Sequence, residues 1–347
     1  MADSIHIVSI IIPHWNGIDV LSECLDSIKQ TSYDSFEIIV SDNASSDGSQ
    51  DWIRKNHPDV ILLENDQNYG YAGGCNRGAE VAKGKYLIFL NNDTIQDPNW
   101  LGPLIDRMKS NESIAAIQPK ILNYYNRKIF DYAGGAGGYM DLFCFPFARG
   151  RIFLNQEEDS GQYNKAQKCF WASGTAMMVQ KDLFITAGKF DETFFAHMEE
   201  IDYHWKCQLM GHEVWVEPLS IIYHKGAVTL PVSSPKKTYL NYRNSLILLL
   251  TNYPIIKSFS LFFPRFFMEC ISLIKEILTF KWGHAFSIIK SWVWIMGHCG
   301  ILKQRRKFLK DKNIAAPELI YQQSIVKKYF IEGKKTHNSL GTFNKNN

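Results

Sequence analysis

The most constraining feature of this sequence is an apolar run that ends directly in a polar triplet. Residues Leu87–Leu90 show no alternation of apolar and polar side chains, which is typical of a strand buried on both faces. Asn91, Asn92 and Asp93 follow at once. In open α/β sheets ligands bind at the carboxyl ends of strands, and a carboxylate beside amides suits a divalent cation and its phosphates. The alternative is a strand-ending Asx turn.

Strands and helices alternate before this run at the pitch of βαβ units. Ile5–Ile12 and Phe36–Val40 are β-branched runs, and Asp19–Gln30 carries apolar residues at helical spacing. We therefore expect the α/β class, with a mostly parallel sheet whose loops gather at one edge. A further apolar strand is expected over Phe170–Val179, where Gly174 permits close approach of a ligand or backbone.

Composition and charge divide the chain into two parts. The 347 residues carry 46% hydrophobic and 21% charged side chains, as in globular proteins. From Lys281 onward, thirteen Lys and Arg residues stand against three carboxylates, so an acidic body precedes a basic end. We predict an α/β domain over residues 1–250 and a helical, basic region over 251–347, whose Phe, Ile, Leu and Trp residues indicate amphipathic helices.

These C-terminal helices are expected to lie on a membrane surface rather than to cross the membrane. The longest uncharged stretches there, Asn244–Ile256 and Ser291–Leu302, are shorter than the ~18–20 residues that span a bilayer. Apolar side chains would lie in the membrane interface, and Lys and Arg side chains would contact anionic lipid. The alternative is packing on the α/β domain or on a second copy of the chain, as a homodimer. Nucleic acid is not expected as a partner.

The N-terminus and the cysteines predict a cytoplasmic protein. No charged segment followed by an apolar one opens the chain, so we expect no signal peptide. Seven scattered cysteines without a CxxC pair indicate reduced thiols and no structural zinc. Together with the C-terminal helices, this places the protein on the cytoplasmic face of the membrane.

Two further segments suit the binding of a nucleotide. Asp42 and Asn43 end the second strand, where a carboxylate can accept a ring N–H of a base. The alternative is a turn with a helix N-cap. The glycine-rich segment Gly70–Gly78 precedes a helix, and its bare N–H groups can seat phosphate. It lacks the Gly-Lys-Ser/Thr of a Walker loop, and the alternative is a tight structural turn.

A carboxylate cluster and a histidine follow in the second half. Glu199, Glu200 and Asp202 lie beside aromatic residues. Crowded, partly desolvated carboxylates have raised pKa values, which suits a general base. The alternative is an acidic first turn stabilised by the helix dipole. His224 ends an apolar strand and is either a packed or capping residue or an imidazole ligand for a metal.

Taken together, these segments resemble a family-2 glycosyltransferase with a GT-A fold, of the rhamnosyltransferase-like bacterial subgroup, over about residues 5–250. The segments that carry the resemblance are Val8–Gly17, Ser41–Gly48, Asn68–Gly78, Asn91–Asp93, Gly188–Glu192 with Glu199–Asp202, His224 and Arg243–Asn244. Asn91 stands where the family has the first Asp of Asp-x-Asp, and Glu200 replaces a more usual Asp.

The resemblance implies an inverting, metal-dependent enzyme. It would move a sugar from a nucleotide-diphosphate sugar, with dTDP-rhamnose as the expected donor, to a saccharide or lipid-linked saccharide in cell-surface polysaccharide assembly. Glu200 is implied as the general base, with Glu199 and Asp202 beside it, and Asp93 and His224 would hold Mg²⁺ or Mn²⁺. The donor is expected to contact Pro13, Asn16, Asp42, Asn43, Gly70, Asn76, Asn91, Asn92, Asp93 and Arg243, and the acceptor Trp171, Gly174, Asp191 and Phe194.

Two other classes of protein remain open. A nucleotidyltransferase has a similar fold and metal chemistry, but it normally carries a basic, glycine-rich loop where His14–Gly17 stands here. A catalytically inactive sugar-nucleotide-binding or scaffold protein is the second alternative, kept open by the departures at Asn91 and Glu200. Such a protein would bind a donor without turnover.

Overall fold

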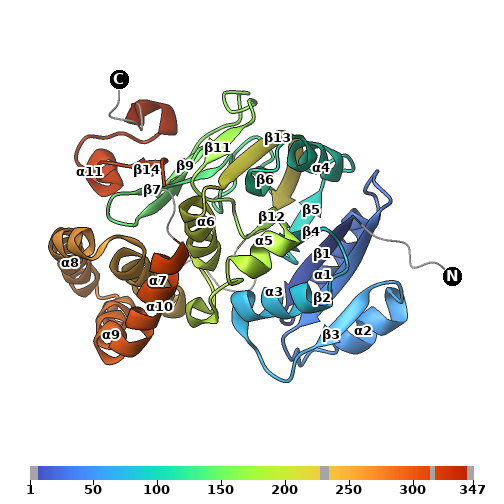
Figure 1. Ribbon diagram of the computed structural model, residues 1–347, viewed down its shortest axis with the longest axis horizontal. Helices are drawn as coiled ribbons and strands as arrows, with labels where there is room; N and C mark the ends of the chain where they lie inside the picture. The colour runs from blue at the N-terminus through green and yellow to red at the C-terminus, as the bar shows by residue number, and fades with distance from the viewer. Residues whose placement is uncertain (1–6, 227–233, 313–316, 342–347) are drawn as a thin grey trace.

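The computed structural model describes residues 7–226, 234–312 and 317–341, and a nine-stranded sheet runs through its centre (Figure 1). The strands of this sheet are β1 (Val8–His14), β2 (Phe36–Asp42), β3 (Ile61–Glu64), β4 (Tyr86–Leu90), β5 (Thr94–Gln96), β6 (Ile114–Asn123), β11 (Gln167–Cys169), β12 (Ala176–Gln180) and β13 (Glu213–His224). Their order is β11-β13-β6-β12-β4-β1-β2-β3, with β5 paired to β13.

The sheet is parallel in its first half and mixed in its second. Strands β4, β1, β2 and β3 are parallel neighbours, as the βαβ pattern predicts. Strand β12 is antiparallel to both β4 and β6, because it follows a long excursion through a second sheet instead of a crossover helix. The α/β class is confirmed, and the antiparallel strands β5, β11 and β12 make the sheet as a whole mixed.

Helices cover both faces of the central sheet. They are α1 (Ile18–Ile28), α2 (Ser49–Asn56), α3 (Gly70–Val81), α4 (Leu101–Ser110), α5 (Lys181–Thr186) and α6 (Glu199–Leu209). One apolar cluster joins the sheet to α3, α5 and α6, and another joins it to α1, α2 and α4. Strand β4 therefore needs apolar side chains on both faces, which explains why its apolar and polar residues do not alternate.

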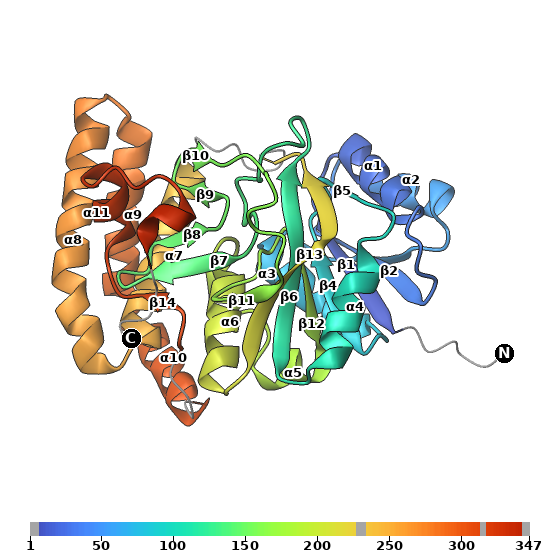
Figure 2. The ribbon, with the colours of Figure 1, turned by 90° about the horizontal axis from the view of Figure 1, so that it is seen from above.

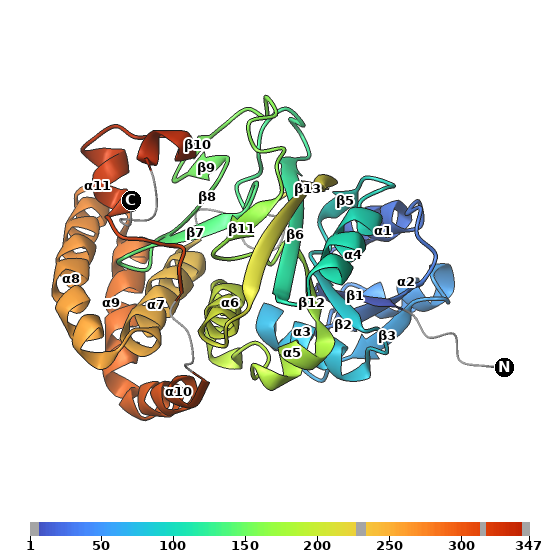
Figure 3. The ribbon, with the colours of Figure 1, turned by 45° about the horizontal axis from the view of Figure 1, so that its top comes forward.

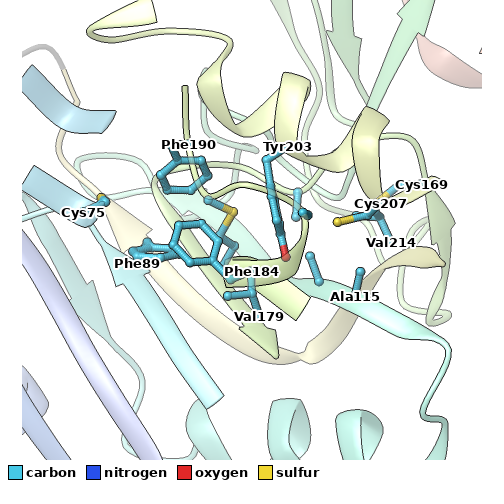
Figure 4. Close-up of a cluster of buried hydrophobic side chains, with 14 of the residues drawn as sticks. Cys75, Phe89, Ala115, Cys169, Val179, Phe184, Phe190, Tyr203, Cys207 and Val214 are labelled. Carbon is cyan, nitrogen blue, oxygen red and sulfur yellow. The ribbon is translucent and has the colours of Figure 1, made fainter. Parts of the chain in front are cut away.

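The side chains of β4 divide between these two clusters. Leu87 and Phe89 pack on the α3, α5 and α6 side, and Ile88 and Leu90 pack on the other. Figure 4 shows Phe89 in the first cluster beside Phe184 and Phe190, with ring centroids 4.9 Å away in both cases. All five residues of β4 are buried, so the strand fixes the position of the polar triplet that follows it.

A second sheet of five strands follows β6 in the chain. Its strands are β7 (Gly138–Asp141), β8 (Pro146–Ala148), β9 (Arg151–Ile152), β10 (Asn155–Gln156) and β14 (Ile320–Tyr321). Strand β14 pairs in parallel with β7, so the C-terminal part of the chain returns to the α/β part. The expected strand over Phe170–Val179 is only partly right, since β12 begins at Ala176 and the residues before it form a loop. That loop carries Trp171 and Gly174.

The predicted C-terminal helical extension is confirmed. Its helices are α8 (Ile255–Leu278), α9 (Trp282–Gly297), α10 (Cys299–Lys312) and α11 (Ile325–Phe330). Helix α7 (Pro235–Asn252) lies almost wholly before the predicted boundary at residue 250, and two short 3₁₀ helices are η1 (Glu192–Phe194) and η2 (His337–Leu340). Helices α8 and α9 form the end of the molecule opposite α1 and α2 (Figures 2 and 3). Within the described ranges no single helix is long and apolar enough to span a membrane; α9 and α10 meet that test only together, bent by 71°.

Candidate functional site

A pocket of about 730 Å³ lies at the carboxyl ends of β1, β4 and β13. These strand ends point the same way across the sheet, so residues far apart in the sequence meet there. Of the residues predicted from sequence, the pocket brings together Pro13, Asn43, Gly70, Asn91, Asn92, Asp93, Trp171, Gly174, Glu199, Glu200 and His224. It does not bring in Asn16, Asp42, Asn76, Asp191, Phe194, Asp202 or Arg243.

Asp93 and His224 form a buried pair on the pocket wall. His224 Nε2 lies 3.1 Å from Asp93 Oδ1, and His224 Nδ1 lies 2.8 Å from Asp131 Oδ1. Burial alone would lower the pKa of His224, but the two carboxylates outweigh it and raise the pKa to about 10. The second carboxylate fixes the orientation of the ring, an arrangement common around metal-binding histidines. Asp131, in the loop after β6, was not among the residues predicted from sequence.

The chemistry of this pair fits a divalent cation. Asp93 Oδ1 is buried, and its contact is His224 Nε2 at 3.1 Å, so a cation bound between the two would replace the Nε2 proton. A carboxylate oxygen and an imidazole nitrogen are suitable ligands for Mn²⁺, while Mg²⁺ prefers oxygen. Across the described ranges no group of three or more His, Cys, Asp or Glu side chains is arranged to hold a metal. A cation bound here would therefore need further oxygen ligands from a substrate or water.

His14 connects the loops after β1 and β4. Its Nδ1 lies 2.9 Å from Asn92 Nδ2, so it accepts that hydrogen bond, and its Nε2 then donates to Ser49 Oγ at 2.9 Å. Burial lowers the pKa of His14 despite the nearby Asp42 and Asp47 carboxylates, which keeps the ring neutral. His14 therefore holds Asn92 at the pocket wall.

The turn after β2 is built around Asp42 and the loop after β1. Asp42 Oδ1 accepts from the backbone N–H of Ser45 at 3.0 Å and from Gln50 Nε2 at 2.6 Å, whereas its buried Oδ2 has no hydrogen-bond partner among the described residues. Asn16, in a left-handed backbone conformation, accepts the N–H of Ser46 at 2.8 Å. Asn16 thus shapes this turn, and Asp42 keeps one acceptor for a ligand group.

The glycine-rich segment serves mainly close packing. The N–H of Gly70 donates to Asn68 Oδ1 at 2.8 Å, so it is not a bare donor for phosphate. A Cβ on Gly74 would lie 2.9 Å from Asn43, and one on Gly78 only 2.4 Å from Ile11. These glycines let α3 approach the sheet closely. The expectation that they seat phosphate is not supported by this geometry.

Glu199 and Glu200 begin α6 at the pocket wall. Burial and the neighbouring Glu200 raise the pKa of Glu199 well above its usual value, and burial raises the pKa of Glu200 to about 7. The Oε2 atom of each has no hydrogen-bond partner among the described residues. Glu199 is 3% exposed and Glu200 is more accessible. Glu200, with a pKa of about 7, can therefore accept a proton near neutral pH, as a general base requires.

The loop before these glutamates is strained. Phe195, His197 and Met198 have φ values of 62°, 68° and 73°, which side chains other than glycine rarely adopt. Asn244 Nδ2 lies 3.0 Å and 2.6 Å from the carbonyl oxygens of Ala196 and His197. These contacts hold the strained loop in place, as is common beside functional sites.

Arg243, an expected donor contact, lies outside the pocket lining, and its guanidinium has partners elsewhere. The guanidinium donates to the carbonyl oxygens of Thr193 and Phe194, at 2.7 Å and 2.9 Å, and to Asn244 Oδ1 at 2.9 Å. Its side chain is therefore committed to the same loop that Asn244 holds. Asn76 is likewise structural, because its Nδ2 donates to the carbonyl oxygen of Phe190 at 2.9 Å.

Three other predicted residues face Arg305 of α10 instead of the pocket. Asp202 Oδ1 accepts from Arg305 at 2.6 Å, and Asp202 Oδ2 pairs with Lys206 at 2.8 Å. Burial would raise the pKa of Asp202, but these two cations hold it well below its usual range. Asp191 also pairs with Arg305, and the fully buried Phe194 ring lies beneath its guanidinium. These three residues, expected beside the general base and the acceptor, lie outside the pocket lining and contact α10.

Basic residues in the pocket were missed by the sequence analysis. They are Arg151, Lys225, Lys236, Lys237 and, at the far end, Arg265. Burial and the nearby Arg151 lower the pKa of Lys237. The three lysines follow His224 closely in the sequence. This proximity to the predicted metal ligand was the one signal that could have identified them as pocket residues.

Comparisons with known proteins identify the family of this chain. The profile of glycosyl transferase family 2 matches residues 9–186, just over half of the chain. A relative from Myxococcus xanthus, the O-antigen biosynthesis protein RfbC, is 26% identical over 67% of this chain and 18% of its own length. A poly(ribitol-phosphate) beta-glucosyltransferase from Bacillus spizizenii is 36% identical over 25% of this chain and 14% of its own length. The chain thus spans less than a fifth of these two relatives.

A solved structure supports the fold. GalNAc-T7, crystallised with UDP, GalNAc and Mn²⁺, aligns with 76% of this chain and 55% of its own chain, at a TM-score of 0.53 and 16% identity. At that identity the likeness concerns the fold alone, which is the expected GT-A type. With the family profile covering the pocket strands β1, β2 and β4, the chain belongs to glycosyl transferase family 2.

Proposed function

We propose that this protein is an inverting glycosyltransferase that takes a sugar from a nucleotide-diphosphate sugar. The observation that carries the proposal is one pocket in which a carboxylate–imidazole pair, Asp93 and His224, faces two glutamates with raised pKa values. The first pair suits a diphosphate with its cation, and the glutamates suit an acceptor hydroxyl. A single pocket with both groups is what a transfer between two substrates requires.

The donor would occupy the sheet side of the pocket. The base would lie against Asn43 and Pro13, which line the pocket wall next to Asp42. Asp42 itself is fully buried outside the pocket lining, and its Oδ2 atom has no hydrogen-bond partner among the described residues. Lys236 and Lys237 add positive charge near the diphosphate position. Mn²⁺ or Mg²⁺, held by Asp93 and His224, would neutralise the charge that develops on the leaving diphosphate.

Glu200 would act as the general base. Its carboxylate takes the proton of the acceptor hydroxyl while the oxygen bonds to the anomeric carbon. The bond from that carbon to the diphosphate oxygen breaks, and the nucleoside diphosphate leaves with the bonding electrons. Attack from the face opposite the leaving group inverts the anomeric centre. Trp171, whose indole N–H donates to the carbonyl oxygen of Tyr139 at 2.8 Å, and Gly174 form a wall for the acceptor.

The substrates follow from the relatives and from the resemblance. One relative is named for O-antigen biosynthesis, which supports a saccharide or lipid-linked saccharide acceptor in cell-surface polysaccharide assembly. We propose dTDP-rhamnose as the donor, because of the rhamnosyltransferase-like segment Asn68–Gly78. The proposed place of reaction is the cytoplasmic face of the membrane, where such donors and acceptors meet.

Calorimetric titration tests the nucleotide site first. The wild type, Asp93→Ala and the control Asp106→Ala, an exposed carboxylate on α4, are titrated with dTDP, UDP and GDP, with and without Mn²⁺. We expect metal-dependent binding of one nucleotide, lost in Asp93→Ala and kept in Asp106→Ala. Absence of nucleotide binding under all conditions would overturn the proposal. Binding of the intact donor without turnover, across a panel of acceptor saccharides, would indicate a sugar-nucleotide-binding protein instead.

A further inference from the structure

Helix α8 packs against the rest of the protein with its polar side. Its buried residues are Ser258, Leu261, Arg265 and Glu269, spaced three or four positions apart, so they form one inward stripe. Arg265 and Glu269 make a buried ion pair at 2.8 Å, and Arg265 also donates to the carbonyl oxygen of Phe143 at 2.7 Å. The polar groups of this helix are therefore satisfied inside the protein.

The opposite side of α8 is apolar and exposed. The stripe consists of Ile256 (83% exposed), Phe259 (59%), Phe263 (70%), Phe267 (66%), Ile271 (54%), Ile274 (55%) and Leu278 (71%). It runs almost the whole 24-residue length of the helix, which is about 36 Å at the usual rise per residue. A helix on a water-soluble protein normally turns its apolar stripe to the core, so α8 has the reverse arrangement.

Helix α9 extends the same surface. It packs beside α8 at the end of the molecule opposite α1 and α2, as the three ribbon views agree. Its exposed apolar residues, with those of the turn between the helices, are Phe280, Trp282, Phe286, Ile289, Val293 and Met296. The apolar face is defined here as these six residues together with the α8 stripe. It is larger than the scattered apolar side chains of ordinary protein surfaces.

The charges around the apolar face are positive. Lys257, Lys275, Lys281 and Lys290 lie on or between α8 and α9. The acidic residues of the same two helices are Glu269, which is 1% exposed, and Glu276, whose side chain is 14% exposed and lies 3.4 Å from Lys275. No carboxylate in the stretch from residue 255 to 297, all of which is described, is classed as exposed. An apolar face with a cationic border complements an anionic lipid surface.

We propose that the apolar face of α8 and α9 binds the interface of an anionic membrane, with the helices lying in the membrane plane. The inner side of α8 reaches the pocket through Arg265, near Tyr242 and Ser245. The pocket and the apolar face are thus separated by about one helix diameter, ~10–12 Å. If the proposed transfer reaction holds, this places the part of the pocket at Arg265 close to the membrane, where a lipid-linked saccharide would present its sugar.

Vesicle flotation of the full chain tests the proposal without donor or acceptor. Vesicles of phosphatidylcholine alone are compared with vesicles containing phosphatidylglycerol. The face variant carries Phe259→Ser, Phe263→Ser and Phe267→Ser. The matched control carries Tyr125→Ser, Leu154→Ser and Leu219→Ser, which are 74%, 83% and 74% exposed away from the face. Thermal unfolding and nucleotide titration establish that each variant folds, and the nucleotide result tests the transfer proposal separately.

We expect the wild type to bind the anionic vesicles and the face variant to bind roughly tenfold or more weakly, with the control unchanged. Brominated lipids should quench the fluorescence contributed by Trp282, measured as the difference between the wild type and Trp282→Phe. Equal losses in the face variant and the control would overturn the proposal. The proposal would also be overturned if the wild type bound neither kind of vesicle and sedimented as a dimer while the face variant was monomeric. The apolar face would then be a subunit interface.

Discussion

The side-chain nitrogen of Asn244 lies 2.6 Å from the carbonyl oxygen of His197, and so connects α7 to the strained loop before the glutamate pair. The loop forms no regular helix or strand, and the backbone N–H of Ala72 also donates to the carbonyl oxygen of Phe195 at 3.2 Å. Asn244 and its neighbour Arg243 supply the donors that its carbonyl groups need. A residue outside the pocket lining therefore positions the groups that would perform the chemistry.

Replacement Asn244→Ala should weaken both stability and turnover. The loss of donors to buried carbonyl groups is expected to lower the free energy of unfolding by about 1–3 kcal/mol. Turnover should fall while the affinity for the nucleotide stays close to wild type, because the donor side of the pocket is untouched. Urea denaturation and steady-state kinetics measure the two effects. The exposed Asn99→Ala is the control. Unchanged turnover in a destabilised variant would contradict the positioning role.

Replacement Glu200→Gln should abolish most of the transfer reaction. Removal of a general base typically lowers the rate by roughly 10²–10⁴-fold, and donor binding should persist. The raised pKa of Glu200, about 7, gives the sign of the pH dependence. The carboxylate must be ionised to accept a proton, so activity should fall as the pH drops through about 7. A wild-type rate that is flat between pH 5 and 8 would argue against this assignment.

Replacement Glu199→Gln should stabilise the protein above neutral pH. Burial raises the pKa of Glu199 in the folded state, so folding is favoured fully only below the unfolded value near 4.5. This stability is lost as the pH rises through the pKa of Glu199 in the folded protein. Glutamine cannot ionise, so the variant does not lose it. We expect the variant to be more stable than wild type at pH 8.5, on the order of 1–2 kcal/mol, and equal to it near pH 4. Urea denaturation at both pH values provides the measurement.

Replacement Arg305→Met should strongly destabilise the protein. It removes one of the two cations that compensate the fully buried Asp202, and breaking such a pair typically costs about 3–5 kcal/mol. The double variant Arg305→Met with Asp202→Asn should recover part of this loss, because no uncompensated charge remains. Guanidinium denaturation of the single and double variants tests the coupling. Strictly additive losses would show that the two side chains act independently.

Much of the α/β part follows from local sequence. The unbroken apolar run of β4 required cover on both faces, and the polar residues after β1, β4 and β13 had to meet because these strands end at one sheet edge. The position of Asp93 at the end of β4 could therefore be predicted from the chain, whereas its pairing with His224 was expected only from the family resemblance. The antiparallel direction of β12 could not be predicted from its own side chains. It depends on the path of the long segment between β6 and β12, which forms most of the second sheet.

The sequence by itself determined which residues of α8 are apolar and that they recur at helical spacing. It did not determine which side of the helix packs against the rest of the protein. Only the tertiary structure decided that the polar stripe with Arg265 turns inward and that the phenylalanines remain exposed. In the same way, the sequence around Asp202 is compatible with a catalytic carboxylate. The ion pair with Arg305, 103 residues away in the chain, gives Asp202 a structural role instead. Local spacing fixes the face on which a side chain lies, whereas its partner, and hence its role, depends on which distant element packs against that face.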